Sequence, residues 1–119
     1  MAEYPFTSRE QEVVRELGRC GFRYVRETKK TIEFVDANER VVELNREHKN
    51  LALVFSFGDM EQLKKHPQVV SAGSRSSSNF KALAHGVTRT GRENHTGVQA
   101  VLRSHESIRG VVKAATEGV

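Results

Sequence analysis

Side chains that could bind or act on phosphate gather in one stretch of this 119-residue chain, from Ser71 to His105. This stretch holds five basic residues and one acid, Glu93, so it alone accounts for the formal net charge of +4. A phosphate-rich ligand needs cations for its charge, small Ser and Gly residues for close backbone approach, and rings for stacking. We therefore expect a nucleic-acid-binding surface made of Arg75, Lys81, Arg89, Arg92 and Arg103, with Phe80 as the stacking ring.

Histidines in the same stretch are the candidates for catalysis. A metal-independent ribonuclease could use His95 as its base and His85 as its acid, with Arg89 or Arg92 stabilising the transition state. The histidines at 85, 95 and 105 are ten residues apart, a spacing that matches no metal-ligand pattern, and the chain has one cysteine. We predict no metal site and no cofactor.

Other reactive residue types occur in less favourable positions. Asp36, Glu47 and Lys49 are the residue types of a metal-dependent nuclease site, but we expect them in separate turns. Lys29-Lys30 is an expected hairpin tip, interpreted as a solvated turn that could extend a nucleic-acid surface. Cys20 follows apolar helical residues, so we interpret it as a packed thiol.

The elements that must position these residues begin with a helix at Thr7 or Ser8. Thr7 and Glu10 have the spacing of a capping box, and an apolar stripe of Val13, Val14 and Leu17 follows. Gly21 is predicted to take a left-handed conformation after the helix, which would place Phe22 against Leu17.

Four strand-like runs between Phe22 and Phe57 alternate with period two, which is typical of an antiparallel meander. Asn38 is predicted to supply the left-handed residue of the second turn. The run from Leu51 to Phe57 is apolar at nearly every position, so we expect a central strand covered on both faces. The other runs predict one solvated face that carries Arg23, Arg26, Glu27, Glu33, Glu43 and Arg46.

The remaining chain predicts two more helices and one more strand. A short helix capped by Asp59 should end at His66-Pro67. Residues 79–84 could form another short helix, and Val98, Ala100 and Leu102 alternate as a last strand. Ser104 is predicted to cap a final helix whose buried side chains are Ile108, Val111, Val112 and Ala115.

These elements predict an α+β fold: an N-terminal helix on an antiparallel sheet of four to five strands, with a C-terminal helix closing the core. We expect one domain over residues 1–119. It comprises a helix, meander and short helix at 7–70, a Ser/Gly-rich basic segment at 71–97, and a strand and helix at 98–117. The order of one helix and three strands resembles the start of HicA-type toxins, although their Gly-Ser-His motif has no counterpart at Glu27-Thr28-Lys29-Lys30.

Composition narrows the class of protein. Hydrophobic residues make up 37% and charged residues 29%, which indicates a folded, soluble chain. We expect no membrane association, because no stretch is apolar for the length of a membrane span. The lone cysteine and the absence of a signal-like N-terminus favour the cytoplasm.

Three functions remain open from the sequence. The first is a small binding module whose 71–105 segment engages an anionic partner, for which RNA or DNA is the leading candidate. The second is a protein-interaction or regulatory factor that binds no nucleic acid. The third is a small metal-independent ribonuclease of the toxin type.

Overall fold

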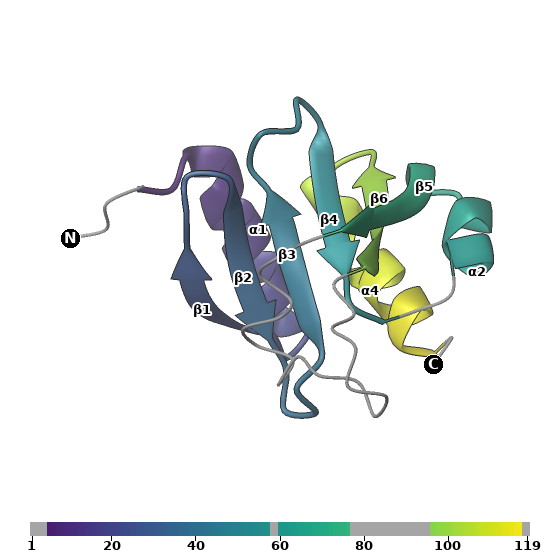
Figure 1. Cartoon of the computed structure of the whole chain (residues 1–119), viewed down its shortest axis with the longest axis horizontal. Coiled ribbons are helices and arrows are strands. Elements are labelled where there is room, and N and C mark those ends of the chain that lie inside the picture. Colours follow the sequence, from purple (N-terminus) through teal and green to yellow (C-terminus); the bar gives the residue numbers. More distant parts are fainter. Residues whose placement is uncertain (1–4, 58–59, 77–95, 118–119) are drawn as a thin grey trace.

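The computed structural model describes residues 5–57, 60–76 and 96–117. Its helices are α1 (Ser8–Arg19), α2 (Met60–Lys65) and α4 (Ile108–Glu117), and a 3-10 turn, η1 (His105–Ser107), leads into α4. Its strands are β1 (Arg23–Glu27), β2 (Thr31–Val35), β3 (Val41–Asn45), β4 (Leu51–Phe55), β5 (Val69–Ser76) and β6 (Thr96–Leu102). Figure 1 shows α1 and α4 on one side of the sheet. The α+β class and the two flanking helices are confirmed.

The strands of the described residues form one antiparallel sheet of six, in the order β1-β2-β3-β4-β6-β5. The prediction of four to five strands is therefore wrong, because β5 was not foreseen. Its sequence, VVSAGSRS, is too rich in small residues to show an apolar alternation. It is held by pairing with β6, from Ser71 opposite Val101 to Ser76 opposite Thr96.

Both ends of α1 form as the sequence predicts. The Thr7 side chain accepts a hydrogen bond from the Glu10 backbone, and the Glu10 carboxylate accepts one from the Thr7 backbone. At the other end Gly21 has φ +90, and the Phe22 and Gly21 amides donate to the carbonyls of Leu17 and Gly18. This is a Schellman ending, which turns the chain from helix into sheet.

The core lies between the sheet and its two helices. Side chains from alternate positions of β2, β3, β4 and β6 pack against α1 and α4. Ile108, Val111, Val112 and Ala115 of α4 are buried, as predicted. Every residue of β4 is buried and the strand lies between β3 and β6, so its predicted central position is also confirmed.

The predicted solvated face is the main error in the fold. Glu33 is 0% exposed and Glu43 is 1% exposed, although both point away from the helix-covered core. Arg46 is largely buried as well. Arg23, Arg26 and Glu27 belong to the edge strand β1, where Arg23 and Arg26 are exposed as expected. The alternation of the sequence assigned side chains to the two faces of the sheet correctly. It could not show that side chains on the face away from α1 and α4 are buried.

Smaller corrections concern caps and turns. The left-handed residue of the β2–β3 turn is Glu39, with φ 63, because Asn38 lies one position too early. Ser104 precedes η1 but its side chain makes no capping hydrogen bond. α2 ends at Lys65, immediately before His66-Pro67, as predicted. The predicted cap at Asp59 and helix at 79–84 lie outside the described residues.

Candidate functional site

Few of the predicted site residues fall in the described part of the chain. Lys81, Arg89, Arg92, Phe80, His85 and His95 all lie outside it. Arg75 belongs to β5, one residue before that strand ends. Arg103 and His105 are described fully, directly after β6, and both line a pocket.

This pocket has a volume of about 220 Å³ and lies where β4 begins and β6 ends. Leu51 and Leu102 contribute apolar wall, and the polar lining is supplied by Arg9, Asn50, Arg103, Ser104 and His105. Its described lining therefore contains cations and neutral donors but no carboxylate. The volume is below the 300–1,000 Å³ of typical sites for drug-sized ligands, so it fits a phosphate group better than a whole nucleotide.

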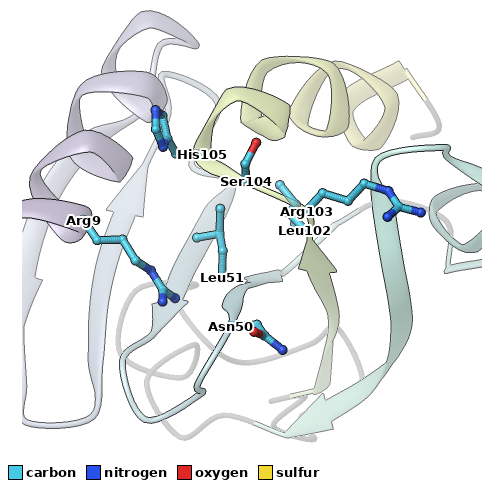
Figure 2. Close-up of a pocket in the computed structure, with 7 residues that line it drawn as sticks. All are labelled: Arg9, Asn50, Leu51, Leu102, Arg103, Ser104 and His105. Carbon is cyan, nitrogen blue, oxygen red and sulfur yellow. The ribbon is translucent and has the colours of Figure 1, made fainter.

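The two arginines of the pocket do not converge on one point. The Arg9 guanidinium reaches toward the β3–β4 turn and donates to the Lys49 carbonyl at 3.1 Å. Arg103 extends away from Arg9 and from the middle of the pocket, as Figure 2 shows, and its Nε donates to the Pro67 carbonyl at 3.0 Å. Each bond uses one N–H group of a guanidinium that has five. The arrangement offers two separated cationic groups instead of a clamp around one ion.

Further cations lie at this same end of the sheet. The turn 28–30 joins β1 to β2 and the turn 46–50 joins β3 to β4, and both face upward in Figure 1, beside the start of α1 and the end of β6. We name this region, formed by residues 7–9, 28–30, 46–50 and 103–105, the basic end. Its exposed cations are Arg9, Lys29, Lys30, Lys49 and Arg103, and its one exposed acid is Glu47.

A sixth cation of the basic end has a structural role. The Arg46 guanidinium makes a bidentate ion pair with Glu10, with Nε–Oε2 at 2.9 Å and Nη2–Oε1 at 3.1 Å. It also donates to the backbone carbonyls of Thr28 and Pro5. Both side chains of the pair are only 10% exposed. Arg46 therefore fastens α1 to the turns of the sheet and leaves the exposed cations as the ones open to a ligand.

Cys20 and Glu33, whose pKa values are altered, do not form a second site. Burial raises the pKa of the Cys20 thiol, and Glu16 raises it further while Arg109 opposes this, so the thiol is not activated. Burial likewise raises the pKa of Glu33, against the hydrogen bond and charge of Arg26. Asp36 is at the opposite end of the sheet from Glu47 and Lys49, so these three residues form no nuclease-like site.

Within the described ranges no cluster of three or more His, Cys, Asp or Glu side chains could hold a metal ion. None of the described helices is long and apolar enough to cross a membrane. Comparison with known proteins adds no relative: no family model, no curated protein and no solved structure matches this chain.

Sequence reasoning did not place Arg9 and Lys49 in a nucleic-acid-binding site. It interpreted Lys29-Lys30 as a solvated turn that could extend a nucleic-acid surface, without connecting it to the other cations. A usable signal was present in the predicted meander. In antiparallel strands every second turn lies at the same end of the sheet, so the turns 28–30 and 46–50 had to be neighbours. The proximity of Arg9 and Arg103 depends on how α1 and β6 pack, which no local pattern reveals.

Proposed function

We propose that this protein is a small binding module that engages nucleic acid through phosphate contacts. The observation that carries this proposal is the concentration of exposed cations at the basic end. There Arg103 and His105, from the basic 71–105 segment, line one pocket with Arg9 from α1. The net charge of +4, which that segment accounts for, supports the same function.

Lysine and arginine contacts to phosphate would dominate such binding. Each contact releases a condensed counterion, so the affinity falls steeply as salt rises. Contacts of this kind fix the position of the ligand but do not read its bases. The proposed module therefore binds with little sequence preference through the described residues.

The direct test is fluorescence anisotropy with a labelled oligonucleotide, as RNA and as DNA, between about 50 and 200 mM salt. We expect affinity to fall at least about 10-fold over this range, and to fall further when Arg9 and Arg103, the two arginines of the pocket, are changed to Glu. Absence of binding at the lowest salt, or binding that salt does not alter, would refute the proposal and favour a protein partner.

No contact among the described residues favours the ribonuclease alternative. Its candidates His85 and His95 lie outside them, and among the described residues that line the pocket His105 is the one histidine. Incubation of RNA with the protein in EDTA, beside a His95→Ala variant, decides this alternative. A cytoplasmic location stays a prediction from the sequence.

A further inference from the structure

The exposed cations of the basic end are arranged along a line and not around a point. The turn 28–30 lies over β1 and β2, the turn 46–50 lies over β3 and β4, and Arg103 follows β6. Neighbouring strands are about 4.8 Å apart, so the line from the first turn to Arg103 measures roughly 17 Å. Measured along the axis of a duplex, that length equals about five nucleotides of one strand, at 3.4 Å each.

The side chains on this line are free to meet a ligand. Lys29, Lys30 and Lys49 are all exposed, and within the described part of the chain only backbone atoms of these lysines form hydrogen bonds. Arg9 donates to the carbonyl of Lys49, which brings the start of α1 to the middle of the line. Since Arg46 is already neutralised by Glu10, it adds rigidity and no free charge.

We propose that the basic end is a track for the phosphate backbone of nucleic acid, in which Lys29, Lys30 and Lys49 contact phosphates beyond those reached by Arg9 and Arg103. This inference rests on the proposed nucleic-acid binding and extends it to residues outside the 71–105 segment. Divergent guanidinium groups suit successive phosphates of a chain, whereas a single bound phosphate would need them to converge.

A matched pair of variants tests the track. In one variant Lys29, Lys30 and Lys49 become Gln. In the control Arg15, Arg23 and Lys113 become Gln; these are exposed cations on α1, β1 and α4, away from the basic end. Both variants lower the formal net charge of +4 equally, so a general attraction between the protein and a polyanion changes by the same amount in both.

The measurement is the affinity for labelled oligouridine and for a labelled DNA duplex across a salt series. For the track variant we expect affinity about 10- to 100-fold weaker at low salt, and a slope of log affinity against log salt smaller by about 2 to 3, since each lost contact removes about 0.7 to 0.9. The control should keep the wild-type slope. Circular dichroism confirms that both variants are folded.

Three outcomes are distinguishable. Loss in the track variant alone supports the inference. Equal loss in both variants, or no loss in the track variant while the wild type binds, overturns the track but leaves nucleic-acid binding standing. A wild-type protein that binds neither probe overturns the proposed function together with the inference.

Discussion

The two ends of the sheet carry similar residue types and use them differently. The basic end has five exposed cations and one exposed acid, Glu47. At the opposite end the β2–β3 turn holds Arg40, which pairs with Asp36 at 2.9 Å and lies over the Phe57 ring at 5.5 Å. Arg40 is therefore engaged in local contacts, whereas the exposed cations of the basic end are accessible to a partner.

This contrast shows that the partners of a charge, more than the number of charges, decide what a surface can do. Arg46 gives an example within the basic end itself, because its guanidinium donates hydrogen bonds to the Glu10 carboxylate and to two backbone carbonyls. An exposed lysine a few residues away keeps its ammonium group for a ligand. Substitutions at the two kinds of cation should therefore act on different observables.

The largest effect on stability is expected for Arg46→Ala. It would leave the buried Glu10 carboxylate without its cation and release α1 from the turn 28–30. Breaking a buried pair by removing one partner costs about 3–5 kcal/mol, so the unfolding free energy from chemical denaturation should fall by that amount. A loss below about 1 kcal/mol would mean that the Glu10–Arg46 pair does not fasten the helix.

A smaller loss is expected for Arg40→Ala at the opposite end. Its ion pair with Asp36 is local and partly solvated, and Asp36 keeps its hydrogen bonds from the backbone amides of Asn38 and Arg40. Together with the contact to Phe57, the change should cost about 1 kcal/mol in the same denaturation experiment. A cost equal to that of Arg46→Ala would remove the difference between the two ends as structural regions.

The smallest effect on stability is expected for a substitution of Glu33, which lies between the two ends of the sheet, and this effect should depend on pH. One oxygen of this buried carboxylate accepts two hydrogen bonds from Arg26, and the other has no partner among the described residues. Burial raises the pKa of Glu33, so the folded protein holds this proton more tightly than the unfolded chain does. Ionisation therefore costs stability as pH rises from the unfolded-state pKa through the raised value in the fold.

Glu33→Gln removes that cost and keeps an acceptor for Arg26. We expect the stability of the variant relative to wild type to increase between about pH 4 and about pH 7, measured by denaturation at each pH. A relative stability that declines over this interval would show that Arg26 outweighs burial and that the ionised form is the one the fold prefers.

Local signals made much of the fold predictable. The Thr7–Glu10 capping box and the Gly21 ending depend on residues within one or two helical turns, and both formed as predicted. β4 was identified as central because its apolar residues are continuous. β5 escaped prediction because Ser, Ala and Gly carry no periodic signal, and only its pairing with β6 makes it a strand.

The sequence predicted an excess of positive charge, but it did not predict which cations lie close together in the fold. Local excess charge made Arg103 a candidate, and the structure shows that it lines a pocket. The neighbourhood of Arg9, Lys49 and Arg103 is set by helix packing and strand order, which act over long sequence separations. The sequence indicated that the Lys29-Lys30 hairpin could extend a nucleic-acid surface, but it did not show that the turn 46–50 lies beside it.

The most direct test of nucleic-acid binding at the basic end is a nuclear magnetic resonance titration of labelled protein with a short oligouridine. We predict that backbone amide shifts change most at residues 28–30, 46–50 and 103–105, and that residues 36–40 at the opposite end stay unchanged. Shifts confined to 36–40, or no shifts at low salt, would contradict the account.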